Sequence, residues 1–312
     1  MTIDHKTNES LKKLSYFSFT GGKLHRQIKN LFIGIFASVF VVILALPVDA
    51  LQAQVTPSNP QLGDTLSVVI NVADSLNGSN PTVTVGENSY KAFAIAQNKY
   101  RALIPTTPLD KPGTLTLKVT GDGEARNLAV NLRSRTFPTQ RINLPPGRAG
   151  VKATEHELQR VAAFKAIETP QKHWNGPMVK PNQGRITTTY GIRRYYNGKF
   201  AQDYYHRGVD YAGAAGSPVI APADGTIALV GEVSAGFIVH GNTIGIDHGQ
   251  GVTSILMHLS QINVKEGDFV KAGQIVGKVG STGASTGPHL HWGLYVNGQS
   301  IDPVPWRFDG ID

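Results

Sequence analysis

Short stretches in which apolar and polar residues alternate recur along the chain after residue 54, and this period of two constrains the fold most strongly. Alternation places the apolar side chains on one face of an extended strand, so each stretch predicts a half-buried β-strand. The 34 glycines among 312 residues supply the tight turns that many short strands require. We therefore expect a mainly β protein.

Residues 1–53 predict a segment that directs export rather than a part of the fold. Six lysines and arginines precede an uncharged apolar run at residues 31–46, which is the order typical of secretory signals. As a helix, residues 31–48 would be about 27 Å long, slightly less than the roughly 30 Å of a bilayer core. The sequence leaves open a cleaved signal peptide and an uncleaved membrane anchor. Both would place the rest of the chain outside the cytoplasm, in the periplasm or cell envelope.

Residues 55–135 predict a small antiparallel β-sandwich of immunoglobulin-like proportions, without the cysteine pair of that fold. The Asp122-Gly123 step between two of its apolar runs is a strong hairpin signal. This part of the chain contains no histidine, so we expect a spacer or binding domain rather than a catalytic one. The alternating runs are Leu66, Val68 and Ile70, then Val83 and Val85, then Leu115, Leu117 and Val119, and finally Leu128, Val130 and Leu132.

Residues 136–183 predict a connector that contains one helix. The Thr-Glu-His-Glu sequence at 154–157 is typical of a capping box that opens a helix, and Thr169-Pro170 would end it. We expect His156 and His173 to be surface or capping residues, because neither has a partner at ligand spacing. The helix is expected to present an apolar stripe made of Leu158, Val161, Ala162 and Phe164.

Residues 184–312 form the part of the chain in which we expect the chemistry. Short apolar stretches interrupted by glycine predict strands at residues 226–230, 242–247, 252–259, 274–279 and 289–296. Six of the ten histidines fall in this part. Four of them and one aspartate lie in three short motifs, which are His206-Arg207-Gly208-Val209-Asp210, Met257-His258-Leu259 and His289-Leu290-His291.

The spacing within the motifs limits where these side chains can point. In a strand, residues i and i+2 face the same side, so His289 and His291 can both project into one cleft. His206 and Asp210 would lie roughly 13 Å apart in an ideal strand, too far to share an ion with ligand bonds of about 2 Å. The chain must therefore bend between them, and Gly208 is the residue that we expect to permit the bend.

The donor types indicate a zinc site without sulfur. The chain has no cysteine, which excludes thiolate ligands, disulfides and a cysteine nucleophile. Two neutral imidazoles and a carboxylate suit zinc with an open fourth position, and two of the five groups then remain for proton transfer. No His-Glu-x-x-His sequence supplies a glutamate base, so histidine, with an unperturbed pKa of about 6.5, must move the proton. Spacing alone leaves open which histidine of the 289/291 pair binds the metal.

The three motifs, in this order, resemble those of the lysostaphin/LytM-type zinc metallopeptidases, which cut peptide bonds in peptidoglycan. The resemblance covers residues 184–306 and includes Gly280-Ser281-Thr282-Gly283 before the last motif. It implies an antiparallel β fold with a groove over the metal. Where the family often has a small or amide residue ahead of its Gly-x-Arg element, this chain has Thr189-Tyr190, a difference that bears on specificity. The resemblance implies that His206, Asp210 and His291 bind Zn²⁺, and that His258 and His289 flank the attacking water as base and transition-state stabiliser.

The resemblance leaves two functions from different classes. The first is a zinc endopeptidase that cleaves cross-links or stem peptides of peptidoglycan in the cell envelope. The second is a non-catalytic binding module of the same fold that activates a separate cell-wall enzyme; such modules typically lack some of the five residues, all of which are present here. We expect His240 and His248 to serve turns or the groove rim, and Trp292 and Tyr295 to be either core or substrate-facing residues.

Net charge adds a constraint on the partner. Residues 1–50 carry a net charge of +3, so about +5 of the total of +8 remains on the rest of the chain. This modest basicity suits an anionic envelope polymer. No nucleic-acid motif is present, so we expect peptidoglycan peptides as partners, a membrane through the N-terminal segment if that is uncleaved, and no nucleic acid.

Overall fold

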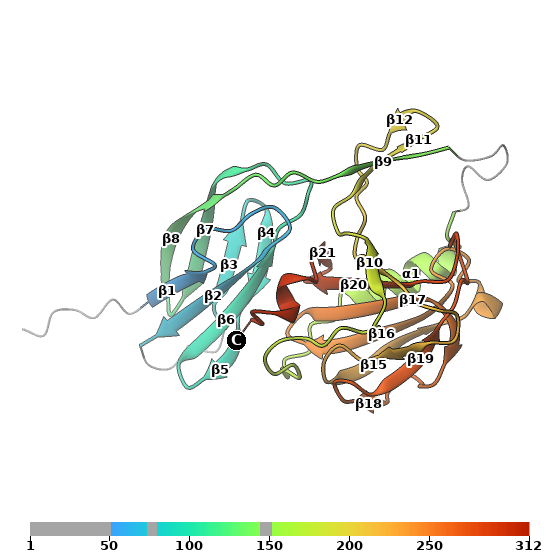
Figure 1. Ribbon diagram of the computed structural model, residues 1–312. Coiled ribbons are helices and arrows are strands. Elements are labelled where there is room, and N and C mark those ends of the chain that lie inside the picture. Colours follow the sequence, from blue (N-terminus) through green and yellow to red (C-terminus); the bar gives the residue numbers. More distant parts are fainter. Residues whose placement is uncertain (1–50, 74–79, 144–151, 312) are drawn as a thin grey trace, which may run out of the picture. The chain divides into compact units, whose positions relative to one another are not determined.

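The computed structural model describes residues 51–73, 80–143 and 152–311 (Figure 1). The expected signal peptide or anchor at residues 31–48 lies outside the described residues. Within the described ranges, the helices are too short or too polar to cross a lipid bilayer. Strands dominate these ranges, which confirms the prediction of a mainly β protein.

Residues 51–132 form two four-stranded antiparallel sheets that share one hydrophobic core. The alternating residues Leu66, Val68 and Ile70 are all fully buried, as their period of two predicts. The first strand begins at Leu51, before the expected start at residue 55, and the likeness to an immunoglobulin sandwich stays a prediction. One sheet has the order β1 (Leu51–Thr56), β2 (Thr65–Val72), β6 (Lys99–Pro105) and β5 (Phe93–Ala96), and the other β4 (Asn88–Lys91), β3 (Thr82–Val85), β7 (Gly113–Gly121) and β8 (Glu124–Leu132).

The hairpin between β7 and β8 forms where the Asp-Gly step predicted it. Gly121 pairs with Glu124, and the two residues between them, Asp122 and Gly123, have φ angles of 52° and 74°. Two positive φ angles in a two-residue loop define the turn that matches the twist of antiparallel strands, and Asp and Gly tolerate them. The predicted hairpin is therefore confirmed.

A ten-stranded sheet organises the C-terminal part of the chain (Figure 1). All five strands expected there from the sequence are present. Inside the described residues, the main path of the sheet is β10 (Arg185–Thr188), β13 (Val209–Ala212), β20 (Leu290–Val296), β17 (Val252–Ile262), β16 (Asn242–Gly249), β15 (Gly225–Gly231) and β18 (Phe269–Val270). Off this path, β14 (Pro218–Ile220) pairs with β19 (Ile275–Val279), β19 also pairs with β17, and β21 (Gln299–Ile301) pairs with β20. Two 3₁₀ helices, η1 (Val233–Ala235) and η2 (Pro305–Arg307), lie in loops.

The expected connector contributes a strand that the sequence did not predict. Strand β9 (Thr139–Ile142) pairs in parallel with β11 (Arg193–Tyr196), which also pairs with the short β12 (Lys199–Phe200). The residues of β9 therefore lie beside the segment that leads into the first motif.

Helix α1 (Glu155–Lys165) begins where the capping residues predicted. The Thr154 hydroxyl accepts a hydrogen bond from the Glu157 backbone N–H at 3.1 Å. The helix ends four residues before the predicted Thr169 boundary. The predicted apolar stripe is only half right, because Val161 and Phe164 are buried, whereas Leu158 and Ala162 are exposed. The buried pair packs against Leu229, Phe237, Ile255 and Tyr295, which fastens α1 to the C-terminal sheet.

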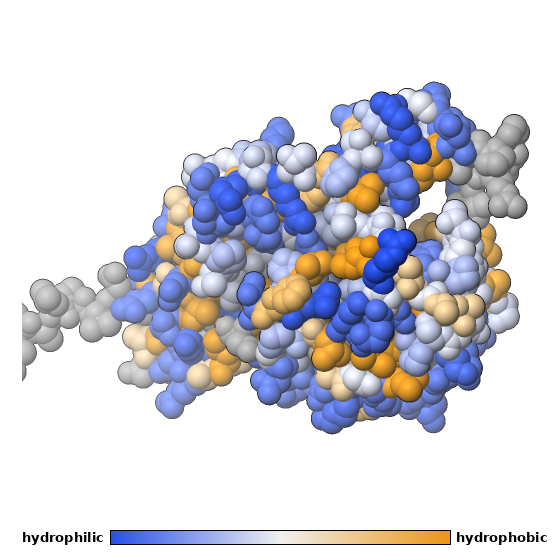
Figure 2. Space-filling view, viewed as in Figure 1, coloured by the Kyte–Doolittle hydropathy of each residue, from blue (hydrophilic) through white to orange (hydrophobic). Residues whose placement is uncertain are grey.

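Polar residues cover most of the surface seen in Figure 2. Apolar residues are scattered among the polar ones on this face. Scattered apolar surface residues are ordinary for a folded protein.

Candidate metal centre

Two neighbouring strands bring an aspartate and a histidine together from distant parts of the sequence. Asp210 on β13 is paired in register with His291 on β20. Directly opposite residues of antiparallel strands have side chains on the same face of the sheet. His206 precedes β13, and its backbone N–H donates to the Ile192 carbonyl at 2.9 Å, which ties the loop to the segment between β10 and β11.

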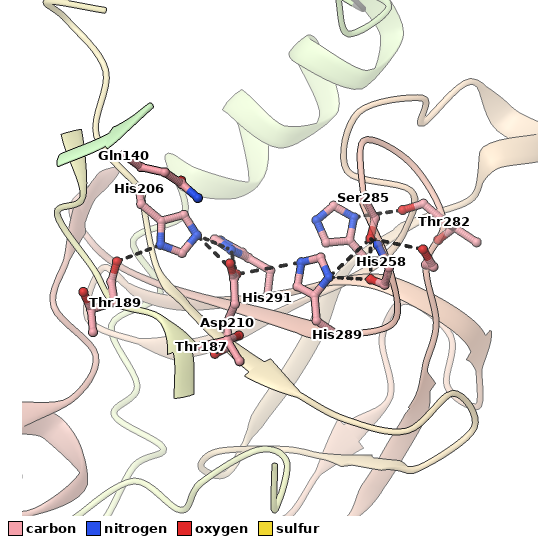
Figure 3. Close-up of polar contacts among 12 residues, drawn as sticks. Gln140, Thr187, Thr189, His206, Asp210, His258, Thr282, Ser285, His289 and His291 are labelled. Carbon is pink, nitrogen blue, oxygen red and sulfur yellow. Dashed lines mark hydrogen bonds and ion pairs between the residues drawn. The ribbon is translucent and has the colours of Figure 1, made fainter. Parts of the chain in front are cut away.

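The three side chains converge on one point (Figure 3). The Asp210 Oδ1 atom lies 2.8 Å from His291 Nδ1 and 3.2 Å from His206 Nε2. The two ring nitrogens lie 3.1 Å apart. Ligands around a tetrahedral zinc ion, with bonds of about 2.0–2.1 Å, are about 3.3 Å from one another. The three donor atoms therefore fit a zinc ion with only small adjustments. Within the described ranges, no other group of three His, Asp or Glu side chains lies close enough together to hold a metal ion.

Neighbouring groups hold these side chains in the forms that bind a metal. The His206 Nδ1–H donates to the Thr189 carbonyl at 2.9 Å, and because a carbonyl can only accept, Nε2 keeps its lone pair. Burial alone would raise the pKa of Asp210, but its contacts with His206 and His291 lower that pKa well below its usual range. Burial also lowers the pKa of His291, which favours its neutral, metal-binding form.

The chain bends at Gly208, as expected from the spacing of His206 and Asp210. The φ angle of Gly208 is not in the left-handed region, and a second, steric reason also requires glycine at this position. A Cβ atom at this position would lie 2.3 Å from the Trp292 carbonyl oxygen and 2.8 Å from His291 Nε2. Gly208 is thus needed because strand β20 and a predicted ligand pass directly over it.

We expect Gly208→Ala to lower both stability and metal binding. The added methyl group must displace β20, and overpacking of this kind typically costs about 1–3 kcal/mol of unfolding free energy. The unfolding temperature and the bound zinc per chain measure the two effects. Gly287→Ala is the matched control, because a Cβ there meets nothing within 4 Å. An unchanged unfolding temperature in Gly208→Ala would contradict this role.

His258 lies on β17 at a bulge that turns it out of the regular ladder. Between the Leu256–Ile244 and Leu259–Asn242 pairs, two residues of β17 face one residue of β16. The φ angle of His258 is 65°, a left-handed conformation that costs a non-glycine residue about 1–3 kcal/mol and persists only when its surroundings enforce it. Bulges of this kind re-aim side chains beside functional sites.

Both flanking histidines are held through Nδ1 and leave Nε2 with a lone pair. His258 Nδ1–H donates to the Thr282 carbonyl at 2.8 Å, and His289 Nδ1–H donates to the Gly287 carbonyl at 2.8 Å. Their ring centroids are 4.8 Å apart, and His289 Nε2 lies 3.9 Å from Asp210 Oδ1. In Figure 3 the His206 ring lies on one side of Asp210, and the rings of His258 and His289 lie on the other.

The proton affinity of His258 differs from the unperturbed value assumed from the sequence. Burial, with smaller contributions from His291 and His289, lowers the pKa of His258 to about 3. The ring is therefore neutral at neutral pH and can accept a proton at Nε2. This change follows from the enclosed position of the ring, which sequence spacing does not reveal.

Several groups at the site were not predicted from the sequence. Gln140, on β9, has an amide oxygen that accepts a hydrogen bond from Arg194 Nε at 3.1 Å. The carbonyls of Thr189, Thr282 and Gly287 orient the rings, but a backbone carbonyl leaves no trace in a sequence. The contact of Gln140 with Arg194 could not be found either, because it depends on the parallel pairing of β9 with β11.

The other histidines in the described ranges lie outside the cluster. His248 was expected in a turn or at a rim, but it is fully buried in β16, where its ring contacts the Asp224 carbonyl at 2.8 Å and the Ser254 hydroxyl at 2.9 Å. His240 contacts Glu157 rather than the cluster. Trp292 and Tyr295 are both buried, which places them in the core.

Comparisons with known proteins agree with this arrangement. Residues 204–303 match the model of peptidase family M23. The DD-carboxypeptidase/endopeptidase Mpg of Neisseria meningitidis is 46% identical over 99 residues, which are 32% of this chain and 22% of that protein. Lysostaphin of Staphylococcus simulans is 47% identical over 106 residues, which are 32% of this chain and 21% of that protein. The similarity to these relatives thus spans about a fifth of their length.

A solved structure is similar over more of the chain. A crystal structure from Pseudomonas aeruginosa, assigned to peptidase M23, superimposes with a TM-score of 0.60 and 26% identity. The superposition covers 81% of this chain and 96% of that one, so the likeness extends well beyond the three motifs.

Proposed function

We propose that this chain, whose residues 204–303 form a peptidase family M23 domain, is a zinc-dependent endopeptidase that hydrolyses peptide bonds of peptidoglycan. One observation carries the proposal: the donor atoms of His206, Asp210 and His291 converge, and two further imidazoles lie beside them with their Nε2 lone pairs free. Three ligands and two proton-transfer groups are what metal-assisted hydrolysis requires.

The three converging residues would hold the metal. His206 would bind through Nε2, Asp210 through Oδ1 and His291 through Nδ1, the atoms that face one another. A zinc ion held there supplies Lewis acidity, which polarises a peptide carbonyl and makes water more acidic. The hydrogen bond from His206 to Thr189 fixes the ring so that its Nε2 points inward.

His258 and His289 would move the protons. One ring accepts a proton at Nε2 from the water that attacks the carbonyl carbon. That ring can then deliver the proton to the amide nitrogen as the C–N bond breaks, so the products are a carboxylic acid and an amine. The other ring, when it carries a proton, can donate to the developing oxyanion. The carbonyls of Thr282 and Gly287 hold both rings in the tautomer that this work needs.

The substrate and location are inferred from the relatives. Mpg is named for carboxypeptidase and endopeptidase activity, and a Vibrio cholerae relative, 36% identical over 119 residues, is named as a peptidoglycan DD-endopeptidase. We extend the peptidoglycan substrate to this chain, and with it an extracytoplasmic location reached through the N-terminal segment. The net positive charge of the chain suits an anionic wall polymer.

A second function remains for the same fold, a non-catalytic module that binds the wall or activates a separate wall enzyme. A module of that kind has no need for proton-transfer groups in a fixed tautomer. The paired hydrogen bonds that hold His258 and His289 therefore favour the enzyme.

The test is digestion of defined muropeptides by the purified chain, with the fragments identified by mass. We expect cleavage of peptide bonds, its loss after a chelator removes the metal, and its recovery on addition of zinc. The fragment masses also show which bond is cut. Binding of muropeptides without cleavage, in the presence of stoichiometric zinc, would support the binding module instead.

A further inference from the structure

We propose that Glu157, on helix α1 and outside the matched segment at residues 204–303, is a positioning residue that holds His258 in its working orientation. The inference rests on the proposed function and adds a residue to its machinery. In the capping box expected from the sequence, the Glu157 side chain would turn back to the start of its own helix. The Glu157 carboxylate faces a different loop.

The Glu157 carboxylate accepts hydrogen bonds from the backbone of three successive residues. Its oxygens accept hydrogen bonds from the backbone N–H groups of Ile238 at 3.1 Å, Val239 at 3.1 Å and His240 at 2.7 Å. The Nδ1–H of the His240 ring donates to the same carboxylate at 2.6 Å. The Glu157 residue is fully buried, so these donors replace the water that a carboxylate would otherwise require.

The charge state of the carboxylate follows from these donors. Burial alone would raise the pKa of Glu157, but the hydrogen bonds from His240 and Val239 lower it below its ordinary value. Burial lowers the pKa of His240, although the carboxylate opposes this, so a neutral ring donates to an ionised carboxylate. All four contacts need an acceptor at residue 157, which an amide side chain supplies on only one of its two arms.

The loop held by Glu157 holds His258 in turn. The His240 carbonyl accepts the backbone N–H of His258 at 3.1 Å. His258 has a left-handed φ angle of 65°, a conformation that persists only when neighbouring groups enforce it. The hydrogen bond to His240 is one of the contacts that enforce it. If the loop moves, the backbone of His258 can relax toward an ordinary strand conformation and carry the ring away from the metal ligands.

A second connection runs from the same loop to the His258 ring. The Val239 carbonyl accepts the Ala284 N–H at 2.9 Å, and the Thr282 hydroxyl accepts the Asn242 N–H at 2.9 Å. The two loops pass so closely that a Cβ on Gly283 would lie 2.4 Å from the Gly241 nitrogen. The Thr282 carbonyl then accepts the ring proton of His258. Hydrogen bonds therefore connect both the backbone and the ring of His258 to the loop at residues 238–240, which the Glu157 carboxylate binds.

The experiment compares Glu157→Gln with the native chain in muropeptide hydrolysis and in amide hydrogen exchange. Misplacing a catalytic group by about 1 Å can cost about a hundredfold in rate, so we expect kcat to fall about tenfold to a hundredfold. KM and bound zinc should change little, because the metal ligands lie on other elements. Exchange at residues 238–240 and at His258 should accelerate.

Two control variants separate positioning from general loosening of the helix. Glu155→Gln removes the same charge from an exposed position on α1 and should match the native chain in every readout. Val161→Ala weakens the packing of α1 without touching the carboxylate, and measured well below its unfolding temperature it should retain kcat. If Glu157→Gln does not fold, Glu157→Asp is the second variant. It keeps the charge but has a side chain shorter by one methylene group, so we expect a smaller fall in kcat and a smaller acceleration of exchange.

Native kcat and native exchange at His258 in a folded Glu157 variant would overturn the inference, and so would an equal loss of kcat in Val161→Ala. If the native chain itself does not hydrolyse muropeptides, the proposed function fails. The exchange measurement at His258 then still decides whether Glu157 holds that residue.

Discussion

In the His206→Ala variant, we expect the purified chain to lose bound zinc and muropeptide hydrolysis together. His206 Nε2 lies within 3.2 Å of both other donor atoms, so its loss opens one side of the cluster. Loss of groups that merely orient ligands costs about tenfold to a hundredfold in metal affinity, and loss of a ligand should cost more. Elemental analysis gives the zinc content per chain, and the muropeptide digest gives the rate.

His156→Ala is the matched control, because this histidine is exposed on α1 and belongs to no ligand group in the described residues. It should keep native zinc content and native rate. Stoichiometric zinc in a folded His206→Ala chain would mean that the ion binds elsewhere, and the assignment of the metal centre would then be wrong.

In the His258→Ala variant, we expect hydrolysis to collapse while zinc stays bound. The ring is held by the Thr282 carbonyl and faces the cluster without being one of the three converging donors. General acid–base groups contribute about a hundredfold to ten-thousandfold in rate, and the loss should fall in that range. Zinc content and the rate of muropeptide cleavage, measured on the same preparation, separate this variant from His206→Ala.

The same variant also separates the enzyme from the binding module. A module that only binds the wall should bind muropeptides equally well without the His258 ring, and it would show no cleavage to lose.

His248→Asn is less suited as a control, because His248 is buried in β16 and held at both ring nitrogens. His173→Ala, a partly exposed histidine of the connector, tests instead whether removing any imidazole lowers the rate.

The strands of this protein could be predicted closely because their signal is local. Alternation at Leu66, Val68 and Ile70 requires only that one face of the strand be buried, and all three are. The Asp122-Gly123 turn was equally readable, because its positive φ angles are properties of the two residues themselves. The order of the strands and the place of β9 in a sheet with β11 were not predictable from such patterns.

The same division holds at the candidate site. Three short motifs and donor chemistry singled out the five candidate residues, and the resemblance to a known family implied which of them bind the metal. The bend at Gly208 was predicted, but the close passage of β20 over this residue was not, because it cannot be seen in the residues around position 208. Glu157 was assigned to its own helix cap, since its partners at 238–240 are about eighty positions away in the sequence.

By itself, the sequence determined a mainly β chain and singled out five candidate residues for metal binding and proton transfer, because side-chain type and short spacing are local properties. Only the tertiary structure decided which atoms of those residues face one another, how far burial lowers the pKa of His258, and which distant groups hold its ring. These depend on strand register and on contacts between loops, which arise only when segments far apart in the sequence pack together.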